Sequence, residues 1–468
     1  MSEPFIPPRP PVRPKKANLV EHLHGIRSGI GMLMAGSYKD AGVGRHGIPT
    51  LPAGKKRWIY MVRHPELIRE ILVRRAPEFP KSALMDDMLR ALTGYSIFVS
   101  NGEAWRRHRR LMDPAFEAAR IKAVFPMMLD AVDACAERLA AHIGGKDAAK
   151  PVAIDVEMTH YAADVIFRTI FSEPMDAEGA RRFFKAFNVF QEIAYAHGML
   201  KLGRVPTHLL PGAWRARRAA KVIRAILEAP IRRRLGAVRA GRPTPQDDIM
   251  ATLMTTVDPE TGTGFDDEEL LDQIAMLFLA GHETSAAAMS WSFYLLANCP
   301  HVQERVHAET VSVMGEGRPA FSHMKRLALT RDVFREALRL YPPVAVLARD
   351  TIGHETMLNR ELDPGSVIFI SPWVMHRHEQ FWDRPDVFDP DRFETENGQE
   401  GLKCAYLPFS AGPRVCAGAS FALQEAALLI AELTRRFSFR PVAGHTPEPV
   451  ARLTLRSANG VPLIVEPR

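Results

Sequence analysis

One long apolar segment, between residues 266 and 300, constrains this chain more than any other feature. The segment reads "DDEELLDQIAMLFLAGHETSAAAMSWSFYLLANCP" and opens with the capping-box residues Asp266 and Glu269. Helical periodicity continues up to Pro300, which predicts one helix of roughly 50 Å. The stretch from Ile274 to Gly281 is apolar on nearly every side, so the helix must be buried and must cross a whole domain.

Four polar or small side chains, at 282–285, interrupt this helix in its middle. Polar groups in a buried helix need a partner or a function. Gly281 leaves room for a ligand, and Thr284 can donate to the carbonyl four residues earlier and loosen the helix. Glu283 supplies an ionisable group, so the segment could pass protons to a bound molecule. The alternative is an ordinary polar contact within the core.

A second unusual stretch, "FSAGPRVCAGASFALQEAALL" (409–429), places a lone thiol between glycines. The run from Ala417 onward has helical periodicity, so Cys416 is expected at a helix N-terminus, where an anion is stabilised. Gly412 allows a positive-φ turn, Gly418 allows close approach of a bulky group, and Arg414 can pair with a carboxylate. The alternative is a buried structural cysteine.

Composition excludes several classes of protein. Four scattered cysteines without a C-x-x-C pair argue against a disulfide framework, and they predict a reducing, cytoplasmic location. No signal peptide and no unbroken apolar span are visible, so we expect a soluble protein. The net charge of +7 comes from basic residues not interleaved with aromatics, which argues against nucleic-acid binding. Membrane contact is expected to be at most peripheral.

The order of patterns along the chain predicts a mainly α protein with small β-sheets. Residues 1–18 form a proline-rich arm, expected to be extended, and 19–468 are expected to fold as a single domain. Most windows from 103 to 340 are helical. β-rich parts are expected near 50–65, 345–376 and 450–468, the last as a hairpin around Asn459-Gly460.

The pattern Phe409-x-x-Gly412-x-Arg414-x-Cys416-x-Gly418 resembles the haem-binding signature of the cytochrome P450 family. Other matches follow in family order: "GEAWRRHRRLMDPAF" (102–116), "AGHET" (280–284), "REALRL" (335–340) and "FDPDRF" (388–393). The resemblance runs from about residue 57 to the end. It implies the cytochrome P450 fold, with haem between the long central helix and the helix after Cys416.

The resemblance also implies roles for individual residues. Cys416 would be the axial ligand of the haem iron, within a loop that includes Phe409, Gly412 and Gly418. The expected propionate contacts are Arg414, Trp105, Arg109 and Arg349. The expected oxygen-activating residues are Ala280, Gly281, Glu283 and Thr284. The expected buried ion network, structural rather than catalytic, is Glu336, Arg339 and Arg392.

The implied activity is that of a haem-thiolate monooxygenase that inserts one atom of O2 into a lipophilic, terpenoid-like or fatty-acid-like molecule. The pocket would draw on 83–98, 183–202, Ala280 and 342–347, which are largely apolar. Two alternatives are a haem-thiolate peroxygenase or isomerase, and a non-enzymatic haem sensor or carrier. The presence of both Glu283 and Thr284 argues against a peroxygenase or isomerase, because a reaction without O2 activation has less use for a proton relay.

The resemblance implies haem b as cofactor and, indirectly, NAD(P)H. Only about fifty residues follow Cys416, too few for a flavin domain, so a separate ferredoxin or flavodoxin with its reductase is the expected partner of a monomeric enzyme. The hypothetical docking patch is Arg106, Arg107, Arg110, Lys403, Arg435 and Arg436.

Two motifs are set aside. "GVGRHG" (42–47) fits a dinucleotide-binding pattern, but no strand precedes it and no helix opens from it. "MHRHE" (375–379) groups His376, His378 and Glu379, and we expect a solvated strand end rather than a metal site.

Overall fold

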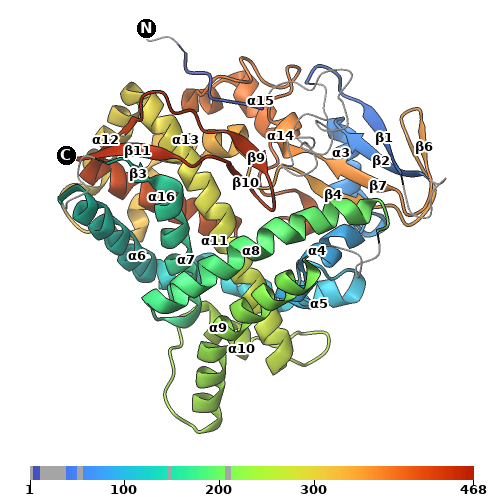
Figure 1. Cartoon of the computed structure of the whole chain (residues 1–468), viewed down its shortest axis with the longest axis horizontal. Coiled ribbons are helices and arrows are strands. Elements are labelled where there is room, and N and C mark those ends of the chain that lie inside the picture. The colour runs from blue at the N-terminus through green and yellow to red at the C-terminus, as the bar shows by residue number, and fades with distance from the viewer. Residues whose placement is uncertain (1–3, 11–37, 50–55, 145–149, 206–211) are drawn as a thin grey trace.

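The structure, a computed structural model, describes residues 4–10, 38–49, 56–144, 150–205 and 212–468. Figure 1 shows most of the helices on one side of the molecule and the strands β1, β2, β7 and β4 on the other. Within the described residues, no helix is long and apolar enough to cross a membrane.

The helices account for most of the chain. The α-helices are α3 (Pro65–Arg69), α4 (Ala83–Thr93), α5 (Gly102–Met112), α6 (Ala118–Gly144), α7 (Ile154–Phe171), α8 (Ala177–Leu202), α9 (Ala213–Arg239), α10 (Ile249–Thr255), α11 (Asp267–Asn298), α12 (Pro300–Met314), α13 (Ala328–Leu340), α14 (Pro372–Met375), α15 (Glu396–Cys404) and α16 (Ala419–Arg436). Shorter π and 3-10 segments are η1 (Glu70–Arg74), η2 (Ala76–Glu78), η3 (Asp113–Phe116), η5 (Phe321–Arg326), η6 (Pro390–Glu394) and η7 (Gly412–Arg414).

Small sheets complete the architecture. The strands are β1 (Val43–Pro49), β2 (Lys56–Val62), β3 (Val152–Ala153), β4 (Leu347–Asp350), β5 (Glu355–Met357), β6 (Arg360–Leu362), β7 (Val367–Ile370), β8 (Phe437–Pro441), β9 (Pro449–Ala451), β10 (Leu455–Ser457) and β11 (Pro462–Pro467). The largest sheet has the order β1-β2-β7-β4, in which only β2 and β7 are parallel. Here β2 comes from the expected N-terminal β-region and β7 from the expected region near 345–376.

The predicted central helix is confirmed as α11, which is 32 residues long and begins with the expected capping box. The Asp266 carboxylate accepts from the backbone N–H groups of Glu268 and Glu269, and the Glu269 carboxylate accepts from the N–H of Asp266. The helix is buried over most of its length because α7, α9, α13 and α16 pack around it. It therefore forms the axis of the main hydrophobic core.

Two local predictions were wrong. The Asn459-Gly460 turn does not close a hairpin: β10 pairs with β9, whereas β11 pairs with β3 and β8. His376 and His378 are fully buried rather than solvated, and His376 is bound to the backbone of Arg339 and Leu407. Residues 42–47 lie largely within strand β1 and no helix opens from them in the described part of the chain, which agrees with setting this motif aside.

The beginning of the proline-rich arm is attached to the body instead of lying free. The Phe5 carbonyl accepts from the N–H of Phe388, and the Phe5 ring lies 6.1 Å from the ring of Tyr294. The Tyr341 hydroxyl donates to the Pro8 carbonyl at 2.7 Å. Residues 11–18 of the predicted arm lie outside the described residues. An apolar side chain near the terminus has therefore anchored an otherwise extended segment.

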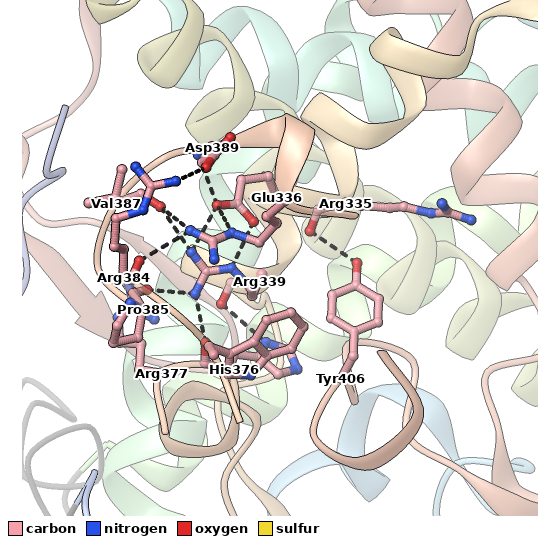
Figure 2. A network of polar contacts seen from close by, with 12 residues as sticks. Arg335, Glu336, Arg339, His376, Arg377, Arg384, Pro385, Val387, Asp389 and Tyr406 are labelled. Carbon is pink, nitrogen blue, oxygen red and sulfur yellow. Dashed lines mark hydrogen bonds and ion pairs between the residues drawn. The ribbon is translucent and has the colours of Figure 1, made fainter. Parts of the chain in front are cut away.

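The predicted ion network is present and fully buried. The Glu336 carboxylate accepts from Arg339 at 2.7 and 2.8 Å (Figure 2). It also accepts from Arg392 at 2.9 Å. Burial by itself would raise the pKa of Glu336, but the two guanidinium groups outweigh it and hold this pKa below its ordinary value. Backbone carbonyls accept from the remaining N–H groups. The Arg339 guanidinium donates to the carbonyls of His376, Pro385 and Val387.

His376 connects this network to the loop that carries Cys416. Its Nε2 accepts from the backbone N–H of Leu407 at 2.7 Å, and its Nδ1 donates to the Arg339 carbonyl at 3.1 Å. Both contacts require the neutral tautomer with the proton on Nδ1. Burial accordingly lowers the pKa of His376 to about 3. The network therefore fixes the chain two residues before Phe409.

We expect Glu336→Gln to destabilise the protein by about 3–5 kcal/mol, because it leaves two guanidinium groups buried without a carboxylate. Urea unfolding of the variant and the wild type measures the difference. Arg305→Ala is the matched control: its pair with Asp391 is about half-exposed and its loss should cost less than about 1 kcal/mol. Equal costs for the two variants would contradict a special role of the buried network.

Candidate active site

The loop from Phe409 to Gly418 is held in one conformation by backbone contacts. The Cys416 N–H donates to the Phe409 carbonyl at 3.0 Å, and Val415 N–H donates to the Gly412 carbonyl at 3.0 Å. Gly412 has φ +71°, and a Cβ there would lie 2.0 Å from the carbonyl oxygen of Leu72 in η1. Only glycine fits this position, as the sequence predicted. The loop therefore packs directly against the backbone of η1.

Cys416 is the one exposed thiol among the four cysteines, which all lie in the described residues. Helix α16 begins at Ala419, two residues later than the sequence pattern suggested, and Gly418 is its N-cap. Crowding by surrounding atoms raises the pKa of the Cys416 thiol, while the Gly418 N–H, Arg109 and Lys81 act in the opposite direction without prevailing. The protein groups alone therefore do not make the thiolate; a metal ion bound to the sulfur would displace the proton.

Three cations gather near this loop without a counter-charge. Arg349 is buried, and burial lowers its pKa to about 10. Burial, followed by the proximity of Arg349, lowers the pKa of Arg414 to about 9. Burial, then Arg349 and Arg414, also lower the pKa of Lys81. Among the described residues no carboxylate lies within ion-pair distance of any of the three, which is costly unless an anion binds there.

Trp105 and Arg109, both on α5, take different positions in this cluster. The Arg414 guanidinium lies over the Trp105 ring at 4.2 Å and donates to Ser100 O and Asn101 Oδ1. Arg109 instead pairs with Asp113 at 2.6 Å and donates to the Val415 carbonyl at 2.7 Å. The structure thus brings Trp105 and Arg414 together and gives Arg109 a contact with the cysteine loop.

The middle of α11 is partly accessible although the helix on either side of it is buried. The accessible positions are Leu279, Ala280, Gly281 and Thr284. Thr284 Oγ1 donates to the Ala280 carbonyl at 2.6 Å, the contact that the sequence predicted. A Cβ at Gly281 would meet Ile166 Cδ1 at 2.9 Å, so the glycine also allows α7 to approach. Its expected role beside a ligand stays a prediction.

Glu283 points away from Thr284. Its Oε1 accepts from Thr454 Oγ1 and from the Arg456 guanidinium, both at 2.7 Å, so the carboxylate faces the strand β10. Its Oε2 is buried and has no hydrogen-bond partner. Glu283 also lines a cleft of about 220 Å³ that includes His160 and Asn188. Neighbouring helix positions point about 100° apart, which separates the two side chains. The sequence alone could not show which partner Glu283 selects.

One buried pair was missed by the sequence analysis. Ser285 on α11 donates to the Glu425 carboxyl on α16 at 2.9 Å. Burial raises the pKa of Glu425 to about 8. This contact ties the residue after Thr284 to the helix after Cys416. The only signal in the sequence was a glutamate on the apolar side of a helix that the pattern marked as buried.

These residues fit the haem group that the sequence resemblance implied. An accessible thiol would supply the metal ligand, and three cations without a counter-charge suit two carboxylates. An accessible, uncharged helix segment suits an apolar, oxygen-binding face. Within the described ranges, no cluster of three or more His, Cys, Asp or Glu side chains offers an alternative metal site.

The six cations expected to form a docking patch are all paired with carboxylates. Arg107 lies 2.7 Å from Glu269, Arg110 lies 2.5 Å from the buried Asp258, and Arg436 lies 2.6 Å from Asp133. The remaining pairs are Arg106–Glu103, Lys403–Glu400 and Arg435–Glu432. The patch is therefore largely neutralised. Three of the pairs have i,i+3 spacing that the sequence contains, whereas Glu269, Asp258 and Asp133 come from distant segments that spacing could not reveal.

Comparison with known proteins gives consistent matches. The family model described as cytochrome P450 matches residues 46–462. Cyclooctatin synthase of Streptomyces melanosporofaciens is 33% identical over 88% of this chain and 87% of its own. Cyclooctat-9-en-7-ol 5-monooxygenase of the same organism is 34% identical over 83% of this chain and 81% of its own. The crystal structure of the cytochrome P450DA haem domain aligns with a TM-score of 0.79 at 24% identity, covering 99% of this chain and 98% of that one.

We expect Glu425 to make stability depend on pH. Because the folded pKa of about 8 exceeds the ordinary 4.5, the folded state holds a proton that the unfolded state releases over that interval. Stability should therefore fall as pH rises from about 4.5 to about 8, by at most about 1.4 kcal/mol per pH unit. Glu425→Gln should remove this slope in urea unfolding at several pH values. If the free energy of unfolding depends on pH in the same way in the variant and the wild type, the raised pKa of Glu425 is contradicted.

Proposed function

Because this chain belongs to the cytochrome P450 family and is a haem-dependent monooxygenase, we propose that it oxidises a lipophilic cyclic hydrocarbon or its alcohol with electrons from a separate ferredoxin or flavodoxin. The observation that carries the substrate proposal is the uncharged accessible face of α11 at Leu279, Ala280 and Thr284. An uncharged surface favours an apolar molecule, since binding a charged one there would leave it unpaired. The family assignment favours this activity over a peroxygenase, an isomerase or a sensor.

The surrounding side chains support an apolar substrate, although fewer of them are free than the sequence suggested. Phe183 and Phe187 of α8 pack against the ring of His282 at 5.1 and 4.7 Å, so they belong to the core. Val346, which precedes β4, and Phe98, which follows α4, are only partly buried. Neither can fix a charged group, so we propose that they contribute to the substrate surface.

The two Streptomyces relatives support the cyclic class. One of them is named for the oxidation of cyclooctat-9-en-7-ol, an unsaturated alcohol, and the other for the synthesis of cyclooctatin. A plant relative of 30% identity is named 11-oxo-beta-amyrin 30-oxidase. These names describe hydrocarbon-rich molecules with few oxygen atoms. We therefore favour such a molecule over a fatty-acid-like one for this chain.

Haem with a thiolate ligand would supply O2 activation when bound. The protein residues have separate tasks in this proposal. Cys416 would bind the iron from a loop that Gly412 and His376 hold in place. Lys81, Arg349 and Arg414 would bind the propionates, with Trp105 against Arg414. Arg109 would support the loop through Val415.

Thr284 and Glu283 would hold and move protons. Since the Thr284 hydroxyl donates to the Ala280 carbonyl, its oxygen lone pairs remain available to accept from water. Glu283 faces the cleft on the opposite side of α11, so we propose that it takes up protons there. To pass them to Thr284, its side chain would have to leave Arg456 and turn toward the accessible side of α11. General acid–base groups of this kind typically contribute about 10²–10⁴-fold in rate.

The electron donor would dock where Cys416 is nearest to the surface. Val415 and Val73 are 37% and 38% exposed, and Val73 lies beside Gly412. Two exposed valines make an apolar centre, and the neutralised cations around α5 and α16 would form a polar rim. We therefore propose a small docking site centred on Val73 and Val415 in place of a strongly charged patch.

The function is tested by NADH consumption with purified ferredoxin and its reductase. We expect consumption to require both proteins and a cyclic terpenoid alcohol, and we expect a product one oxygen atom heavier by mass spectrometry. Long-chain fatty acids at the same concentration serve as the comparison. Faster turnover with the fatty acids would contradict the substrate class. Product formation with peroxide and no reductase at an equal rate would contradict the proposed electron source.

Thr284→Ala is expected to lower product formation about 10²-fold or more and to release peroxide instead, because the proton-delivering hydroxyl is lost. Product and peroxide are measured per NADH consumed. Ser285→Ala is the matched control, since its hydroxyl faces Glu425 and not the accessible side of α11. If both variants release peroxide equally, the assignment of Thr284 is wrong.

A further inference from the structure

The positive charge of this protein is concentrated in one segment. Residues 193–227 contain seven Lys or Arg residues and no Asp or Glu. The whole chain has 61 basic and 54 acidic residues, so the rest of it carries 54 of each. The entire formal net charge of +7 therefore belongs to the end of α8, the beginning of α9 and the connection between them. This distribution is not a general basicity of the surface.

Two of the seven cations are used inside the structure. Lys201 pairs with Asp87 on α4, and Arg224 lies 2.7 Å from Asp272 on α11. The five others are exposed and have no ion pair with any carboxylate of the described residues; these are Arg204, Arg215, Arg217, Arg218 and Lys221. This is unlike the surface around α5, where every expected docking cation is paired. The five cations therefore remain available to an external anion.

The available cations share a helix face with an exposed aromatic ring. Trp214, Arg217, Arg218 and Lys221 have the three- and four-residue spacing that places side chains on one side of a helix. We call these four residues the cationic face. Trp214 is 66% exposed, the highest value among the large apolar side chains of the described residues. The opposite side of α9, with Ala216, Ala220 and Ile223, is buried.

The end of α8 adds to this surface. Figure 1 shows α8 and α9 side by side, and a Cβ on Gly212, just before α9, would lie 3.5 Å from Ile193 of α8. Leu200 in the last turn of α8 is 40% exposed, and Arg204 follows it. An exposed aromatic and an exposed aliphatic side chain thus accompany the unpaired cations.

We propose that the cationic face docks this enzyme onto an anionic lipid bilayer. Basic side chains bind the negative lipid headgroups, and a tryptophan inserts its ring at headgroup depth while its indole N–H stays hydrated. An acidic protein is the other class of partner with complementary charge. We favour lipid because the cations and the exposed Trp214 ring form one stripe along a surface helix, which is the pattern of a helix lying on a charged bilayer surface. Docking there would also hold the enzyme where a lipophilic substrate dissolves. The inference does not depend on the identity of that substrate.

The test is co-sedimentation of the full-length, haem-containing protein with vesicles. Vesicles of phosphatidylglycerol mixed with phosphatidylcholine should bind it, and pure phosphatidylcholine vesicles should not. Each basic side chain near an anionic surface contributes about a fivefold change in partitioning, so Arg217→Ala with Arg218→Ala should lower binding about 25-fold. High salt should weaken the wild-type interaction, because it screens charge beyond a few ångströms.

The matched control is Arg181→Ala with Arg182→Ala, two adjacent exposed arginines near the other end of α8. This pair should leave vesicle binding unchanged. Trp214 is tested separately: bromine-labelled lipid should quench wild-type fluorescence more strongly than that of Trp214→Phe. Equal loss of binding in both arginine pairs would mean non-specific attraction and would overturn the proposal.

Two further outcomes would also overturn the proposal. One is the absence of binding to anionic vesicles at low salt. The other is unchanged vesicle binding in the Arg217/Arg218 variant together with slower reduction by ferredoxin, which would make the face a protein dock. Oxidation of dissolved substrate should be unaffected in the variant. A loss of that oxidation would concern the proposed function and not the lipid contact.

Discussion

The buried Glu336 carboxylate is the interaction on which the position of the reactive loop depends. It lies between two guanidinium groups, and all three side chains are almost completely removed from solvent. Such an arrangement is stable only when every donor is satisfied, and here the backbone of 376–387 provides the acceptors. His376 then transmits this order to Leu407. An ionic cluster distant from the chemistry thus fixes the segment that ends at Cys416.

The charge distribution separates structural from ligand-binding cations. Many arginines of the described residues pair with carboxylates, some within one helix, as Arg106 does with Glu103, and some from distant segments, as Arg110 does with Asp258. Two groups of cations lack a carboxylate partner in this part of the chain and also lie beside a feature that suits an anionic ligand. Lys81, Arg349 and Arg414 are unpaired near the exposed thiol, which suits a dianionic cofactor. The cationic face on α9 is unpaired and exposed, which suits an extended anionic surface. At both places the missing counter-charge coincides with a second feature, which is the exposed Cys416 thiol in one case and the exposed Trp214 ring in the other.

The sequence predicted what depends on local pattern. The long buried helix, its capping box, the Thr284–Ala280 contact and the positive φ of Gly412 all follow from spacing and residue type. It did not predict the choice of distant partners. Asn459-Gly460 favours a hairpin locally, but β11 pairs with β8 and β3, because tertiary contacts outweigh turn preference. The close approach of Ile166 on α7 to Gly281 was likewise not predicted, because this neighbour comes from another helix. The expected single domain stays a prediction.

The central claim is that Cys416 binds haem iron as a thiolate in a site completed by uncompensated cations. The most direct measurement is the absorption spectrum of the dithionite-reduced protein with carbon monoxide, compared with Cys416→Ser. We predict a strongly red-shifted Soret band for the wild type and its absence in the variant, because thiolate donation to the iron causes the shift. A band typical of imidazole ligation, or the same red-shifted band in both proteins, would contradict the account.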